Sequence, residues 1–184
     1  MELFIYQHGN YYSFKNDSNI ELFVGRLNSI WVFSGQLKAL AKDLRTDETI
    51  ATSKSRLKLF PPRAYFDITY KDTSFQLKFG KLRFSCSFKD SLYELIPHKG
   101  YLTSIFQDGL QIGYYETQAF SSFNCFCKVV LNNKADLELI CTFILAVKCD
   151  FSEERQNINI DFGNFGREAK PFDYNWSPDL SRLY

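Results

Sequence analysis

The longest apolar run in the chain lies between Leu137 and Val147, where only Glu138 and Thr142 are polar. A helix drawn through this run is apolar nearly all round, so its neighbours must enclose it on most sides. The run is shorter than the roughly 20 residues of a bilayer-spanning helix, and a run of roughly 10 to 14 residues is more often a buried core helix. We therefore predict a central buried helix over about residues 134–149.

The flanks of this run carry helix start and stop signals. Asn132 or Asn133 can cap the start by accepting hydrogen bonds from free backbone N–H groups. Asp136 and Glu138 would lie near the positive end of the helix dipole, and Lys148 near its negative end.

Most of the remaining chain alternates apolar and polar residues, which is the pattern of half-buried strands. Turn residues separate the alternating segments. Asp108-Gly109 is the clearest turn, and Gly25 and Gly35 are also interpreted as turns. The predicted strands are residues 3–6, 11–14, 20–24, 29–34, 37–44, 54–60, 65–70, 75–79, 82–88, 92–97, 102–106, 110–116, 123–131 and 158–160. Residues 37–44 also fit a short helix, and residues 46–53 are polar and predict a loop.

The composition agrees with one β-rich domain. Aromatic residues make up 17% of the 184 residues, and they favour pleated, half-buried surfaces. All-β barrels of roughly 200 residues routinely form a single domain. The formal net charge is +1, from 22 basic and 21 acidic residues. This balance gives no overall attraction to nucleic acid, so nucleic-acid binding is not expected and any basic site must be local.

The order of elements, many antiparallel strands and then one apolar helix, resembles the tubby C-terminal-like fold. Tubby domains share this fold with phospholipid scramblases and plant LURP-one-related proteins. Gly100–Gly113 looks like the penultimate hairpins of the scramblase and LURP-one group, and Lys134–Phe151 resembles their final helix. The resemblance implies a closed antiparallel β-barrel of about twelve strands around the helix. Such a wide barrel needs a plug, because its own side chains cannot fill it. A smaller lipocalin-type barrel would instead pack a one-sided amphipathic helix outside.

The barrel is expected to span residues 1–162, followed by an aromatic tail over residues 163–184. The tail has no periodic pattern and carries Phe165, Phe172, Tyr174 and Trp176 among polar residues and prolines. Exposed aromatic side chains are costly, so we expect the tail to pack on the barrel or on a partner.

The sequence contains no recognisable catalytic motif, such as a nucleophile elbow, a phosphate-binding loop or a zinc-protease helix. His8 and His98 fall in predicted turns. Cys125 and Cys127 share a strand face but lack a second pair of ligands, so buried thiols are a better interpretation than a metal site. The remaining cysteines are expected to be small core residues: Cys86, Cys141 and Cys149. We expect no enzyme activity, cofactor or metal.

Residues 150–161 are rich in acidic and amide side chains. Scramblases carry a calcium-binding segment just after the corresponding helix, so the resemblance raises a calcium hypothesis here. The spacing does not follow an oxygen-ligand loop, which favours a solvated loop.

The most distinctive surface pattern is a basic ladder formed by Lys54, Arg56 and Lys58, with Arg63 beyond two prolines. On a strand these residues share one face at intervals of about 7 Å, a spacing suited to phosphate groups. Tubby domains bind phosphoinositides through basic residues on the barrel wall, so the resemblance favours this interpretation. The alternative is a solvated face, or lysines that protect a sheet edge from aggregation.

We therefore expect a non-enzymatic binding module for anionic phospholipid or phosphoinositide head groups. The alternative is a protein-interaction or structural barrel that self-associates through its tail. A third hypothesis, an apolar ligand inside the barrel, requires an interior that the helix does not fill. An odd number of cysteines, five, and an N-terminus without secretory features predict a cytoplasmic protein, which could associate peripherally with a membrane.

Overall fold

The structure is a computed structural model that describes residues 1–8, 11–29, 37–43, 49–59, 62–80, 82–98, 101–117, 126–150 and 171–179. Twelve strands and one helix lie within these residues. They are β1 (Glu2–His8), β2 (Tyr11–Asn16), β3 (Glu21–Ser29), β4 (Leu37–Asp43), β5 (Thr49–Leu59), β6 (Pro62–Tyr70), β7 (Thr73–Gly80), β8 (Arg83–Phe88), β9 (Ser91–Pro97), β10 (Leu102–Gln107), β11 (Leu110–Thr117), β12 (Phe126–Leu131) and α1 (Leu137–Asp150).

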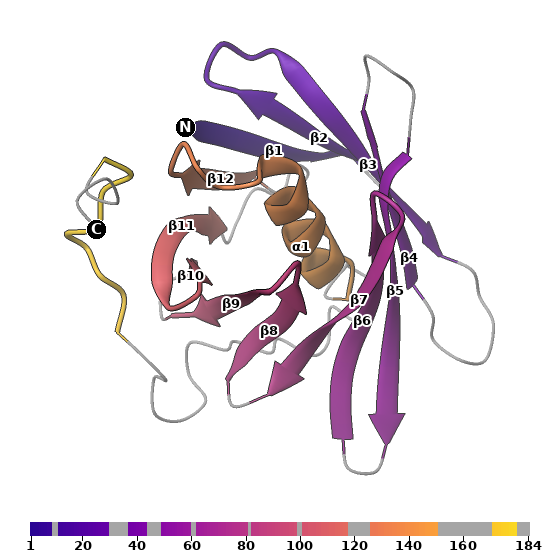
Figure 1. The fold of residues 1–184 in the computed structure, drawn as a ribbon. Helices are drawn as coiled ribbons and strands as arrows, with labels where there is room; N and C mark the ends of the chain where they lie inside the picture. Colours follow the sequence, from indigo (N-terminus) through magenta and orange to yellow (C-terminus); the bar gives the residue numbers. More distant parts are fainter. Residues whose placement is uncertain are drawn as a thin grey trace.

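The strands form one large antiparallel sheet, in which strands consecutive in the chain pair with one another. The first strand pairs on both sides: Ile5 of β1 lies opposite Phe14 of β2 and opposite Cys127 of β12. The N-terminal ammonium of Met1 extends the seam with β12 by donating to the carbonyl of Leu131 at 2.8 Å. The sheet thus curves around α1 (Figure 1). The predicted mainly β chain with one buried helix is confirmed.

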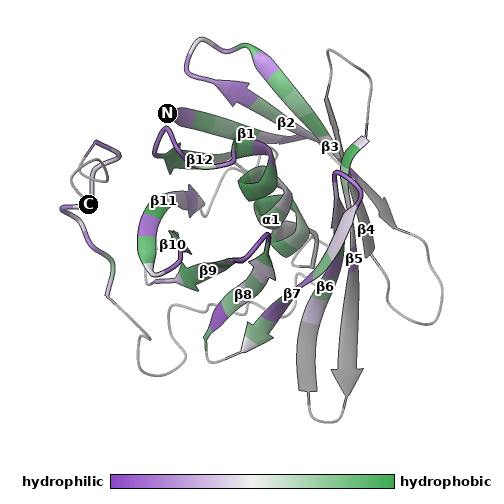
Figure 2. Ribbon diagram, viewed as in Figure 1, coloured by the Kyte–Doolittle hydropathy of each residue, from purple (hydrophilic) through white to green (hydrophobic). Residues whose placement is uncertain are grey.

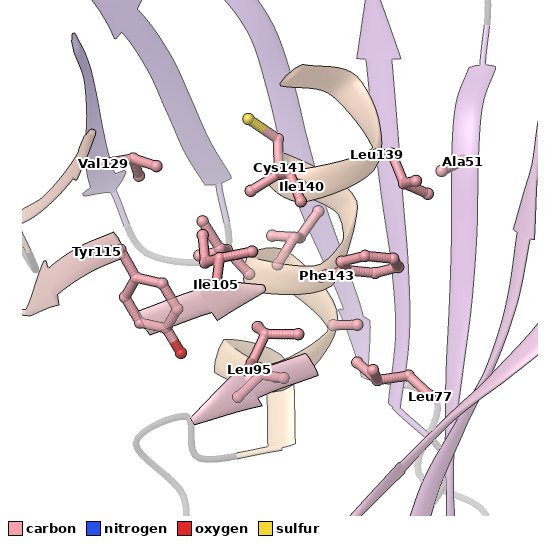
Figure 3. Packing of buried hydrophobic residues seen from close by; sticks show 14 of the residues in the cluster. Ala51, Leu77, Leu95, Ile105, Tyr115, Val129, Leu139, Ile140, Cys141 and Phe143 are labelled. Atoms are coloured by element: carbon pink, nitrogen blue, oxygen red, sulfur yellow. The ribbon is translucent and has the colours of Figure 1, made fainter. Parts of the chain in front are cut away.

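The interior is occupied by the apolar side chains of α1, which Figure 2 shows as a green helix within the sheet. Leu139, Ile140 and Phe143 are fully buried. The Phe143 ring packs edge-to-face on Phe75 of β7 and Tyr93 of β9, with ring centroids 5.9 and 5.6 Å apart. Figure 3 shows the helix among side chains from many strands: Ala51, Leu77, Leu95, Ile105, Tyr115 and Val129. Each fully buried Leu or Phe side chain stabilises the fold by roughly 1.5–3 kcal/mol.

The helix begins at a different cap from the one predicted. Asn132 Oδ1 accepts hydrogen bonds from the N–H groups of Lys134 and Ala135, at 3.1 and 2.9 Å, and so stabilises a turn before the helix. Asp136 Oδ1 accepts the N–H of Leu139 at 3.1 Å and caps α1. The prediction of an asparagine cap is therefore wrong, because an asparagine side chain serves a tight turn as readily as a helix start.

A polar network ties the start of α1 to the sheet. The Tyr70 hydroxyl of β6 lies 3.0 Å from Asp136 Oδ1 and 3.2 Å from Glu138 Oε2, and Lys71 Nζ lies 2.5 Å from the same Glu138 oxygen. Burial, followed by the two nearby carboxylates, raises the pKa of Tyr70 well above its usual value. The hydroxyl therefore stays protonated and donates to the carboxylates that flank the helix start.

Two glycines, Gly25 and Gly113, lie where a neighbouring element comes too close to leave room for a side chain. Gly25 was expected in a turn, but β3 continues through it to Ser29. A Cβ atom at Gly25 would lie 2.8 Å from Leu145 Cδ2 of the helix. At Gly113 in β11, a Cβ atom would lie 2.4 Å from Leu131 Cδ2 and 2.6 Å from the carbonyl oxygen of Val130. Neither glycine breaks its strand.

Other differences from the expected strands have simple causes. Strand β5 begins at Thr49, so the loop predicted over residues 46–53 is wrong for its second half. Ala51 and Ser53 are buried and Thr52 is exposed, so buried and exposed positions alternate here. Because the buried residues are small, the sequence shows no alternation of large apolar and polar residues. The ambiguous segment 37–44 is a strand over Leu37–Asp43. Residues 30–34 and 158–160, also predicted as strand, lie outside the described residues.

Replacing Gly113 by alanine should destabilise the fold by roughly 1–3 kcal/mol, because the new methyl group meets backbone atoms that cannot move aside easily. Urea unfolding followed by circular dichroism measures this change. Gly80→Ala in β7 is the matched control, since nothing lies within 4 Å of a Cβ atom there. Equal stabilities of the two variants would contradict the close approach of β11 and β12.

Replacing Tyr70 by phenylalanine should lower the free energy of unfolding at pH 7 by roughly 1–2 kcal/mol, because the carboxylates of Asp136 and Glu138 lose the hydroxyl that donates to them. Folding raises the pKa of the Tyr70 hydroxyl. The contribution of this hydroxyl to the free energy of unfolding is therefore present below the unfolded tyrosine pKa of about 10 and is lost as the pH rises further. The difference between wild type and variant should therefore shrink from pH 7 to about pH 11. Tyr174→Phe, at a residue that is 81% exposed, is the control. A difference that is constant with pH would contradict the network.

Candidate functional site

The basic ladder of β5 lies on the outer face of the sheet. Ser53 is buried, Thr52 is exposed and Lys54 is half-buried, which identifies the face of Lys54 as the outward one. The period of two places the positions of Arg56 and Lys58 on the same face. The structure describes the backbone and not the side chains at Lys38, Arg56, Lys58 and Arg63, so the place of these residues on this face follows from strand register.

The hairpin of β5 and β6 brings Arg63 into the same surface. In the register of this hairpin Arg63 lies directly opposite Lys58, Tyr65 lies opposite Arg56, and Asp67 lies opposite Lys54. Paired residues of antiparallel strands share a face of the sheet. The four predicted site residues therefore come together on two neighbouring strands, although two prolines separate Arg63 from the ladder in the chain.

The register adds two basic positions that sequence reasoning missed. Lys38 of β4 lies directly opposite Lys54. Lys78 of β7 lies opposite Tyr65, in the same cross-strand row as Arg56, and its side chain is exposed. Alternation within β7 marks Lys78 as outward-facing, but only the pairing tells which strand is its neighbour. We refer to Lys38, Lys54, Arg56, Lys58, Arg63 and Lys78 as the basic face.

Within the basic face, like charges lie directly opposite one another. Lys38 pairs with Lys54, and Lys58 pairs with Arg63. Like charges in direct cross-strand pairs destabilise a sheet. Asp67 is the acidic position in these rows, and its Oδ1 accepts a hydrogen bond from Gln76 Nε2 at 2.9 Å. Asp67 shares its row with Lys38 and Lys54, and the other four basic positions lie in the next two rows, in a chain whose net charge is only +1.

Strand β5 pairs with β4 over Thr49–Lys54 and with β6 over Ala51–Leu59. Lys54 therefore lies between two paired strands, where a lysine does not guard a sheet edge. In the described register Arg56 and Lys58 pair with β6 alone, so the edge-protecting interpretation stays open at these two positions. It remains beside a solvated face and an anion-binding face.

The histidines and cysteines lie elsewhere. His8 ends β1 and is exposed, whereas His98 follows β9, is buried, and has its Nε2 2.9 Å from Ser104 Oγ. The side chains of Cys86, Cys127 and Cys141 are buried. Burial raises the pKa of Cys86 to about 12 and that of Cys141 well above its usual value, so these two groups stay protonated. A protonated, buried thiol is a poor nucleophile and a poor metal ligand.

Two of the hypotheses from the sequence concern residues that the structure does not describe. Cys125 of the cysteine pair and residues 151–161 of the calcium hypothesis lie outside the described residues. The side chain of Cys149 is not described either. Among the residues that are described, no three His, Cys, Asp or Glu side chains gather closely enough to hold a metal ion. No helix in the described part of the chain has the length and apolar character needed to cross a membrane.

Residues 171–179, the described part of the aromatic tail, pack against the outer face of β11. Trp176 Nε1 donates a hydrogen bond to the carbonyl oxygen of Gln111 at 3.1 Å, and its ring lies edge-to-face on Tyr114 at 5.8 Å. Phe172 packs on both Tyr114 and His98, each with ring centroids 5.4 Å apart. In Figure 1 this tail, drawn in yellow, runs outside the sheet.

Comparison with protein-family models, with curated proteins and with solved structures finds no match for this chain. The resemblance to the tubby-like fold stays a prediction.

Proposed function

We propose that this protein is a non-enzymatic binding module that holds anionic phospholipid head groups on the basic face. The observation that carries the proposal is the strand register, which sets Lys38 opposite Lys54 and Lys58 opposite Arg63. Each pair costs stability in the free protein. A bound phosphate relieves the repulsion in both pairs, whereas a surface that is merely solvated gains nothing from placing its cations opposite one another.

The spacing of the basic face suits a ligand with more than one phosphate. Neighbouring outward positions on one strand are about 7 Å apart, and directly opposed positions on two strands have Cβ atoms about 5 Å apart. Arginine can bind one phosphate through two hydrogen bonds, and lysine adds a point charge. A phosphoinositide head group, which carries several phosphates on one ring, therefore fits this face better than a lipid with a single phosphate.

The proposal takes the sheet as a closed barrel plugged by α1, in the manner of the tubby-like fold. The pairing of β1 with both β2 and β12 supports closure. A closed, filled barrel holds the basic face rigid, so binding does not have to order the backbone. The helix side chains already occupy the core, which argues against an internal apolar ligand. The module would act at the surface of an anionic membrane, to which a cytoplasmic protein is recruited by charge.

The double variant Lys54→Glu/Arg56→Glu should lose phosphoinositide binding. Each lysine or arginine near an anionic membrane contributes about 1 kcal/mol, so one charge reversal should weaken binding by roughly tenfold or more. Co-sedimentation with phosphatidylcholine vesicles, with and without phosphatidylserine or a phosphoinositide, measures the effect and separates the two lipid classes. Lys134→Glu, at an exposed turn before α1, is the matched control. Equal partitioning of wild type and double variant would sink the proposal.

Lys78→Glu should weaken the same binding about as much as Arg56→Glu alone, because both positions lie in one cross-strand row through Tyr65. Binding of the wild type should fall as salt is raised from 50 to 500 mM, since exposed charges are screened. Vesicle co-sedimentation in a salt series tests both statements. If Lys78→Glu binds like wild type while the ladder variant does not, the site is confined to β5 and β6.

A further inference from the structure

The outer face of β11 carries a second surface, which the proposed lipid site does not use. It consists of the Tyr114 ring, the carbonyl oxygen of Gln111 and the ring of His98, and we call it the tail-binding surface. In this structure the surface is occupied by residues 171–179 of the same chain. Residues 171–179 therefore show which side chains this surface recognises.

The bound segment is a compact turn with two aromatic anchors. Asp173 organises the turn: its Oδ1 accepts the N–H of Asn175 at 2.9 Å, and its carbonyl accepts the N–H of Trp176 at 3.2 Å. The turn presents the rings of Phe172 and Trp176 to Tyr114, while Tyr174 is 81% exposed. Because these contacts come from one short segment, recognition of the segment does not depend on the rest of the chain that carries it.

The contact between residues 171–179 and the tail-binding surface is small, so the binding is firm only when the two are linked. Edge-to-face aromatic pairs contribute roughly 0.5–1.5 kcal/mol each beyond burial, and a hydrogen bond contributes roughly 1 kcal/mol net. A linked segment benefits from an effective concentration in the millimolar range. The same segment on another molecule makes identical contacts once the protein concentration approaches that range, so exchange between copies loses no interaction.

We propose that the tail-binding surface of one copy accepts the tail of a second copy, so that the chain self-associates by exchanging residues 171–179. The second copy is the occupant we favour, since its tail is the sequence already seen to fit the surface. The proposal gives the self-association expected from the aromatic tail a defined receiving surface. It is independent of lipid binding, because it uses β11 and not β4 to β7.

Two variants that fail in different ways test the exchange. Phe172→Ala/Trp176→Ala removes the anchors and keeps the surface, and Tyr114→Ala removes the surface and keeps the anchors. Each variant alone should be a monomer in sedimentation velocity at about 0.1–1 mM, near the effective concentration of a linked segment. An equimolar mixture should contain a heterodimer, since the tail of the second variant can bind the surface of the first. Wild type should show a dimer fraction that rises with concentration.

The matched control mixes the anchor variant with a Tyr114→Ala chain that also lacks both anchors, and this mixture should stay monomeric. A mixture of the two single-defect variants that sediments as monomers throughout this range would overturn the proposal. Should Tyr114→Ala not fold, a synthetic peptide of residues 171–179 replaces it, and the peptide should bind the anchor variant. A peptide with alanine at positions 172 and 176 should not bind. Failure of the native peptide to bind would overturn the proposal equally.

Discussion

The burial of α1 is the constraint on which the rest of this structure depends. The consecutive residues Leu139, Ile140, Cys141 and Thr142 point in directions about 100° apart around the helix and all are buried, so no side can be left to water. Enclosing the helix requires a wide sheet. The antiparallel strands form this sheet, in which β1 pairs with both β2 and β12. Small residues adjust the fit: Gly25 admits Leu145, and Ala51 lies against the helix in the core.

Because the side chains of α1 fill the interior, any binding surface lies on the outer face of the sheet. The wall offers two chemically distinct surfaces, a basic one across β4 to β7 and an aromatic one on β11. Both are set on strands of the antiparallel sheet, whose pairing holds their backbone in place. The register of the basic face sets cations opposite one another, an arrangement that costs stability unless an anion lies between them.

Much of this fold follows from pattern alone. The uniform run from Leu137 to Val147 predicts an enclosed helix, and alternation identifies most strands to within a few residues. The errors share one cause: a residue was assigned the role it plays most often. Gly25 was interpreted as a turn and the asparagines before α1 as caps, but a glycine also admits a neighbour and an asparagine also stabilises a turn.

The sequence by itself determined that Lys54, Arg56 and Lys58 share one face, because side chains alternate along any strand. It also determined that the tail is rich in aromatic rings. Only the tertiary structure decided that Lys38, Arg63 and Lys78 join that face, that Lys54 lies between two paired strands, and that Trp176 meets Gln111. These are long-range pairings, and the period of two within a strand carries no information about which strand lies beside it.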